Sequence, residues 1–340
     1  MRAVLGILVL AITAWLALAL LAPKGTSVPA QAFSSSRECQ DCHTEIYAEW
    51  EESQHAMSWT NPAVRLLSND FANQDCIDCH APQPVFVTGI GNRVKPRTLR
   101  RAEGVDCISC HQLPANADGT PGGMAGGMND ERAACRPTER RELARPDHCA
   151  GCHNQHKTVD QWRESSWFDG VDKQDCSDCH MPIVEGPNGS HRSHLFPGGD
   201  TLSMLQRAVT FEGGAQGGAW QVTISNTGGG HAFPTDERSR AADIFWRILG
   251  DNDTVGPWRH LHRMRSPYRT EVDVEDTLLQ ADEVRVLPVT SEPEGVGDPI
   301  AADLAIEVAL FYKRSPYWID AEAPDPDAEA TLVYALELRP

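Results

Sequence analysis

The sequence is short of positive charge. Its 340 residues include 30 Lys and Arg against 48 Asp and Glu, a formal net charge of −18. This excess excludes nucleic acids and anionic membrane surfaces as partners, because both would repel it. Residues 201–340 hold 23 of the acidic and 12 of the basic residues, so a net of −11 is concentrated in the last part of the chain.

Regular hydrophobic periodicity is scarce in residues 33–204. Segments 44–59 and 158–167 are expected to form helices, and 118–128, with two Gly-Gly pairs and a Pro, is expected to be a loop. A region with so little regular structure can be stable only if something other than its own side chains fills the core.

Cysteine is absent after residue 179 but dense before it. The 11 Cys are too many for a cytosolic enzyme of this size, and ten of them fall in five C-x-x-C-H stretches. The paired cysteines are Cys39 and Cys42, Cys76 and Cys79, Cys107 and Cys110, Cys149 and Cys152, and Cys176 and Cys179; the histidines that follow them are His43, His80, His111, His153 and His180. The remaining Cys135 is expected to be an inert, small apolar residue.

C-x-x-C-H is the attachment sequence of c-type haem. Two thiols three positions apart reach the two vinyl groups from one side of a helical turn, and the adjacent His supplies the proximal ligand of the iron. Zinc sites combine two C-x-x-C units and do not require a His after each. Independent disulfides give no reason for a His after all five Cys pairs. A thioredoxin-like motif needs a βαβ pattern, which the sequence lacks. The sequence therefore predicts five covalently bound haem c groups, whose large apolar rings would fill the core.

Eight further histidines are available as sixth ligands. They are His55, His148, His156, His191, His194, His231, His260 and His262. Five irons need at most five of them, so every iron could be bis-histidine, although a lone His without a metal is the usual alternative at each position.

Several stretches resemble the multihaem cytochromes c related to the tetrahaem electron carrier of nitrifiers, hydroxylamine oxidoreductase and pentahaem nitrite reductase. The resemblance covers most of residues 37–235 and rests on C-x-x-C-H…W-x-x-S-x-H-A from Cys39, Glu-Gly-Val before Cys107, C-H-M-P from Cys179, H-x-F-P-G-G from His194 and G-H-A-F-P-T around His231. It implies that His55, His194 and His231 are distal ligands, each to a haem other than the nearest in sequence. His148, His156 and His191 share the remaining candidacy.

The sequence also departs from this family. Trp162 to Trp167 repeats Trp50 to His55 but has Trp in place of the ligand His, so one ligand is missing or supplied from elsewhere. There is no C-x-x-C-K, and hence no counterpart of the lysine-ligated catalytic haem of pentahaem nitrite reductase. The crosslinked Tyr of hydroxylamine oxidoreductase has no recognisable counterpart either.

After residue 205 the pattern changes to alternating apolar and polar residues. Such runs occur at 220–224, 244–248, 283–286, 306–312 and 331–338, separated by Gly, Pro, Asn and Asp. This pattern is typical of a small antiparallel β-sandwich. We predict an α + β chain of two domains: a helical, loop-rich pentahaem cytochrome c domain at 33–204 and a β-sandwich at 205–340, preceded by an N-terminal segment at 1–32.

The N-terminal segment predicts export. Residues 3–22 form an uncharged, apolar stretch long enough to span a bilayer, which favours an uncleaved anchor. Ala30-Gln31-Ala32 matches a signal-peptidase site, although it lies about ten residues past the stretch, so a cleaved signal stays open. Arg2 keeps the N-terminus cytoplasmic in either case, and residues 33–340 would be periplasmic.

Electron transfer is the leading hypothesis for function, with redox proteins as partners, such as a quinol-oxidising membrane module or other cytochromes. An alternative is a reductase of a small nitrogen or sulfur oxyanion at one five-coordinate haem. A third is docking of a partner cytochrome through the acidic β-domain.

Overall fold

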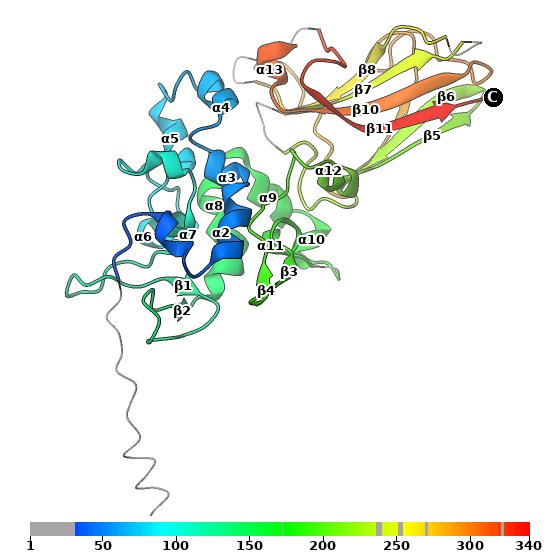
Figure 1. Ribbon diagram of the computed structural model, residues 1–340. Helices are drawn as coiled ribbons and strands as arrows, with labels where there is room; N and C mark the ends of the chain where they lie inside the picture. The colour runs from blue at the N-terminus through cyan, green and yellow to red at the C-terminus, as the bar shows by residue number, and fades with distance from the viewer. Residues whose placement is uncertain (1–30, 172, 236–239, 251–253, 269–270, 321–322) are drawn as a thin grey trace, which may run out of the picture.

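The computed structural model describes residues 31–340 except 172, 236–239, 251–253, 269–270 and 321–322. Helices occupy the first part of the chain and sheets the second (Figure 1). The predicted N-terminal anchor or signal lies almost wholly outside the described residues. Within the described ranges, no helix is both long and apolar enough to cross a bilayer.

The helical part consists of short helices and turns joined by long loops. Its elements are η1 (Ser36–Cys39), α2 (Thr44–Glu51), α3 (Gln54–Met57), α4 (Pro62–Leu67), α5 (Gln74–His80), α6 (Val85–Thr88), η2 (Arg101–Glu103), α7 (Cys107–His111), β1 (Ala125–Gly126), β2 (Thr138–Glu139), η3 (Arg141–Ala144), α8 (Pro146–His153), η4 (Asn154–His156), α9 (Thr158–Arg163), α10 (Ser166–Asp169), α11 (Cys176–His180), β3 (Ile183–Gly186) and β4 (Gly189–Arg192). Even α2 and α8 have only eight residues, too few for a helix to be stable alone. The region therefore depends on core material beyond its own helices.

Each of the two long helices expected from the sequence is broken in two. Segment 44–59 forms α2 and α3, and segment 158–167 forms α9 and α10. The breaks fall at Ser53 and Ser165, whose side chains accept hydrogen bonds from the backbone amides of Ala56 and Trp167, in the first turns of α3 and α10. A serine in extended conformation that caps a new helix ends the previous one, so the prediction of continuous helices was wrong.

The second part is built from two antiparallel sheets that share one core (Figure 1). Its elements are α12 (Leu202–Ala208), β5 (Thr210–Gln216), β6 (Ala219–Ser225), β7 (Ala241–Ile248), β8 (Arg259–Met264), β9 (Val284–Pro288), β10 (Ile306–Lys313), α13 (Pro316–Ile319) and β11 (Ala330–Leu338). The strand orders are β5-β6-β9 and β11-β10-β7-β8. Residues of both sheets, such as Trp220 and Trp246, are buried in the common core.

All five predicted strands are present, but β5 and β8 were not predicted. β5 contains a Gly-Gly pair, and β8 carries four basic residues among six. In β8, Arg263 is buried and donates to both carboxylate oxygens of the buried Asp243, each at 2.7 Å. Although burial raises the pKa of Asp243, Arg263 and its neighbours hold it well below its ordinary value. A buried ion pair thus replaces the apolar alternation by which strands are recognised.

The two parts of the chain meet through α9 and α10 on one side and the loops after β6 and before β9 on the other. Thr235 donates to Gln161 at 2.9 Å, and the hydroxyl of Ser166 donates to Asp282 at 2.7 Å. The domain boundary predicted at residue 204 falls inside α12, where Leu205 joins the core of the sheets. The division into domains stays a prediction.

Candidate haem-binding sites

Each C-x-x-C-H motif occupies one short helical turn. Four of the motif histidines (His80, His111, His153 and His180) are the last residues of α5, α7, α8 and α11. The first motif differs, because Cys39 ends η1 and His43 precedes α2. A single helical turn places the two thiols on one side with the imidazole next to them, which is the arrangement that covalent haem attachment requires.

The motifs lie against one another in a definite order. The turns and helices of motifs 1 and 3, 2 and 4, and 4 and 5 are in contact, and the thiols of Cys39 and Cys107, Cys79 and Cys152, and Cys149 and Cys176 lie close enough together to share a hydrogen bond. Cys110 is also close enough to oppose the ionisation of both Cys149 and Cys152, so motif 3 lies near motif 4 as well. Thioethers cannot donate, so what persists after haem attachment is the adjacency of motif 1 to 3, 2 to 4, 3 to 4 and 4 to 5.

Three motif histidines face a second imidazole from a distant segment. The ring centroids are 6.1 Å apart for His55 and His153, 6.3 Å for His111 and His194, and 6.3 Å for His180 and His231. A metal–nitrogen bond of about 2.0 Å plus about 1.1 Å from nitrogen to ring centre, counted twice, gives roughly 6.2 Å between two imidazoles on one metal. The spacing of all three pairs fits an iron between the rings.

Hydrogen bonds to the backbone set the tautomer of several of these rings. In His80, His111 and His180, Nδ1 donates to the carbonyl oxygens of Ser58, Ala125 and Pro197 at 2.7–2.8 Å. In His194 and His231, Nδ1 likewise donates to backbone carbonyls. A carbonyl only accepts, so Nδ1 holds the proton and Nε2 keeps a free lone pair for a metal. The residues present therefore fit haem iron.

Burial favours the neutral form of the three facing histidines His55, His194 and His231, and a metal ligand must be neutral. Burial, together with nearby histidines, lowers the pKa of His55 to about 3, and that of His194 to about 4. The pKa of His231 is also lowered, mainly by burial. Phe196 packs against both His55 and His194, with ring centroids 4.3 and 5.7 Å away, and so separates the two imidazoles.

The other candidate histidines have varied surroundings. His156 is near enough to contribute to the lowered pKa of His80, which burial dominates. His148 is buried against Phe86, and neither of its ring nitrogens has a hydrogen-bond partner. His191 pairs with Glu49 at 3.2 Å. In the sheet part, His260 and His262 pair with Asp243 and Glu294.

The repeat seen in the sequence is also a repeat in structure. Trp50 Nε1 donates to the carbonyl of Val105, and Trp162 Nε1 to that of Gln174, in each case two residues before the first Cys of a motif. Ser53 and Ser165 each donate back to the carbonyl of their Trp at 2.7 Å.

The two copies differ at their last position. His55 faces the motif histidine His153, whereas the equivalent Trp167 packs against Gly230, beside His231. Because His180 already faces His231, motif 5 has a facing imidazole despite the presence of Trp167.

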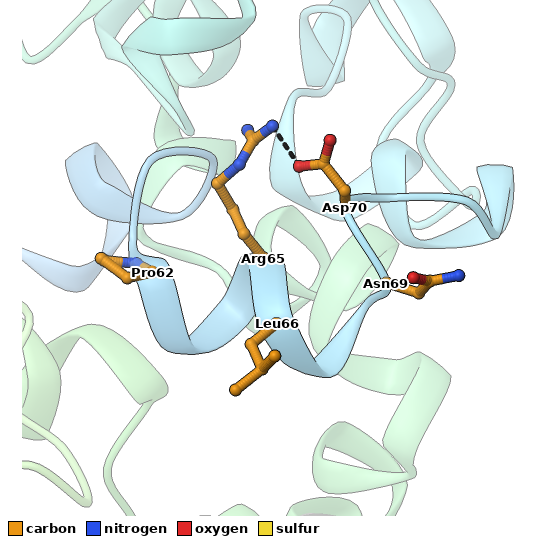
Figure 2. A pocket seen from close by; sticks show the side chains of 5 residues that line it. All are labelled: Pro62, Arg65, Leu66, Asn69 and Asp70. Atoms are coloured by element: carbon orange, nitrogen blue, oxygen red, sulfur yellow. Dashed lines mark ion pairs between the residues drawn. The ribbon is translucent and has the colours of Figure 1, made fainter.

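A surface hollow on α4 lies apart from these groups. Pro62, Arg65, Leu66, Asn69 and Asp70 line it, and Figure 2 shows Arg65 and Asp70 joined by an ion pair across one side. Leu66 is 81% exposed. The hollow contains no Cys or His and is not a haem site.

Sequence reasoning missed the carbonyl groups that orient the motif histidines. Ser58, Ala125 and Pro197 act through their backbone, so their side chains give no signal. Only Pro197 lies in a motif of the family resemblance, H-x-F-P-G-G.

Residues 38–112 match the family of cytochrome c554 and c-prime. No curated protein matches the chain. Among solved structures, the chain is similar to a penta-heme cytochrome c552 from Thermochromatium tepidum, with a TM-score of 0.62 and 20% identity over 89% of this chain and 98% of that one. Neither the helices nor the sheets alone could supply 89% of the chain, so the shared fold includes both.

Proposed function

We propose that this chain, a multihaem c-type cytochrome, transfers electrons along five covalently bound haems outside the cytoplasm. The observation that carries the proposal is that each of the five attachment motifs lies against at least one other. Haem supplies one-electron chemistry when bound, and the protein's part is to hold the haems close together and to set their ligands and surroundings.

The contacts between motifs support a branched relay. Motif 1 adjoins motif 3, motif 3 adjoins motif 4, and motif 4 also adjoins motifs 2 and 5. Electrons would then pass between motif 1 and motif 5 through motifs 3 and 4, with motif 2 as a side branch.

The facing imidazoles support His55 as the distal ligand of the motif 4 haem, His194 of motif 3 and His231 of motif 5. His156 is the candidate for motif 2. Bis-histidine ligation gives lower potentials than His/Met ligation, because a thioether ligand raises the potential. A relay between a quinol-oxidising membrane module or another cytochrome and a periplasmic acceptor would suit low-potential haems.

We expect five haems per chain in holo-protein from a strain that has the haem-maturation system. Each motif should form two thioether bonds, and the pyridine haemochrome assay counts the products. Cys135→Ala, which alters the one cysteine outside the motifs, should keep all five and serves as the control. A count of four or fewer in the unaltered protein would contradict the five-fold assignment.

We expect the protein to be membrane-associated, with its haems on the outer face of the cytoplasmic membrane. The uncharged stretch 3–22 is long enough to span the bilayer. Cell fractionation and N-terminal sequencing check this. A soluble periplasmic protein beginning at Phe33 would identify a cleaved signal, and a cytoplasmic holo-protein would refute export.

A further inference from the structure

The segment that follows β10 is tied to the four-stranded sheet by a cluster of buried charged groups. The side chain of Lys313, at the end of β10, is 1% exposed, and those of Asp243 on β7 and Asp320 after α13 are 0% and 3% exposed. Arg263 on β8 pairs with both carboxylates. The cluster thus encloses two cations and two anions, which is costly unless their polar atoms are all paired.

One polar atom of this cluster is not paired. Asp320 Oδ2 contacts Lys313 Nζ, and it also accepts hydrogen bonds from Arg263 Nη2 at 3.1 Å and from the backbone amide of Asp325 at 2.9 Å. The other oxygen, Asp320 Oδ1, is buried and has no hydrogen-bond partner among the described residues. An ion pair alone does not explain this oxygen, because a buried polar atom without a partner costs free energy.

The same geometry suits formation of a bond between the two side chains. Asp243 Oδ2 lies 3.1 Å from Lys313 Nζ. Burial alone would raise the pKa of Asp243, but the donors around it hold the pKa well below its ordinary value, so Asp243 is an ionised base at neutral pH. Arg263 and the Asp325 amide both donate to Asp320 Oδ2, as the donors of an oxyanion hole do. A lysine nucleophile, a base and two oxyanion donors therefore surround one carboxyl carbon.

We propose that Lys313 and Asp320 are joined by an intramolecular amide (isopeptide) bond. Nζ of Lys313 bonds to Cγ of Asp320, and the bond from Cγ to Oδ1 breaks. Of the three protons on the ammonium group, one stays on the amide nitrogen and two leave with Oδ1 as water. Asp243 takes a proton from Nζ and passes it to Oδ1, so Asp243 ends unchanged and no oxidant or co-reactant is needed. The reaction removes the unpaired oxygen and leaves Oδ2 as an amide carbonyl that keeps both donors.

The bond would brace the sheet part covalently. This part contains no cysteine, since all 11 lie before residue 180, and so it cannot form a disulfide of its own. The amide would close a ring over residues 313–320, which includes α13, and would fix this segment to the end of β10.

Digestion of the denatured full-length holo-protein with trypsin, followed by mass spectrometry, tests the proposal. Trypsin cleaves after Arg314, so an unjoined chain gives separate peptides on either side of this residue. The amide should block cleavage after Lys313 and keep 286–314 and 315–340 together as one branched peptide, lighter than the two peptides by one water molecule. Separate peptides of full mass would overturn the proposal and leave the cluster as an ion-pair network only.

Two variants identify the groups that react. Lys313→Arg keeps the positive charge but cannot form this amide, so it should give separate peptides; a branched peptide in this variant would overturn the assignment to Lys313. Asp243→Asn removes the base beside Nζ and should leave most chains unjoined, whereas an unchanged joined fraction would contradict the role of Asp243. The unaltered protein decides the main question even if a variant fails to fold, and its peptide masses do not depend on the haems.

Discussion

Replacing His231 by Ala should convert one low-spin haem to high-spin and loosen the sheet part from the helical part. The rings of His180 and His231 are 6.3 Å apart and nearly parallel, with an interplanar angle of 11°. The substitution removes one of these two imidazoles, and with it the link that an iron between them would make across the two parts of the chain.

The loop that carries His231 approaches the helical part closely. A Cβ on Gly230 would lie 3.0 Å from Trp162 and 3.3 Å from Trp167 of the helical part. Within the sheet part, a Cβ on Gly228 would overlap the carbonyl oxygen of Arg207 in α12. Only glycine allows the backbone to come this near. These contacts hold His231 at one position in the loop. After the substitution, we expect no neighbouring side chain to replace the lost imidazole.

Electron paramagnetic resonance counts the irons in the His231→Ala protein, and limited proteolysis between residues 195 and 201 reports separation of the parts. His191→Ala is the control, since His191 pairs with Glu49 and should leave all low-spin signals in place. If His231→Ala keeps every low-spin signal, His231 is not a ligand, and the sheet part is held only by hydrogen bonds such as Ser166 to Asp282.

Replacing both Cys149 and Cys152 by Ala should be the most damaging change in the chain. Motif 4 adjoins motifs 2, 3 and 5. Its haem would therefore pack against more of the core than any other haem, and all routes of the relay would pass through it. We expect a loss of about 4 kcal/mol or more, at the upper end of single-site effects. For a region of this size, that is a fall of roughly 10 °C in Tm.

Thermal unfolding and the kinetics of reduction by a chemical donor measure the two effects. Cys39→Ala with Cys42→Ala removes a haem at the periphery and is the matched control, expected to cost less stability and to leave motifs 3, 4 and 5 in contact. Equal losses in the two double variants would show that motif 4 is no junction.

The sequence predicted the attachment residues because their chemistry is local. Two thiols and an imidazole within five positions need no tertiary information. The partners of His153, His111 and His180 were not readable from spacing, since each facing imidazole comes from a segment at least 50 residues away. Those residues were named only through the family resemblance.

The order of the motifs in space was not predictable either. It depends on irregular loops, whose course is set by contacts such as that of Trp50 with Val105. In the sheets, too, elements with a local sequence pattern were predicted and an element that depends on tertiary contacts was not. Strands with apolar alternation were predicted, whereas β8 escaped because its stability comes from the buried pairing of Arg263 with Asp243, which lies on another strand.

The two Trp–Ser turns divide the haem-binding part of the chain into two similar units, as a duplication would. One unit runs from motif 1 through Trp50 to motif 3, with motif 2 as an insertion, and a second, shorter unit runs from motif 4 through Trp162 to motif 5. His55 of the first unit reaches into the second, at His153. No third C-x-x-C-H unit follows the second one in the sequence, and Trp167 packs against Gly230 of the sheet part instead. A longer relative made by copying the same unit would need imidazole at position 167 and would have to move the sheets away from Gly230.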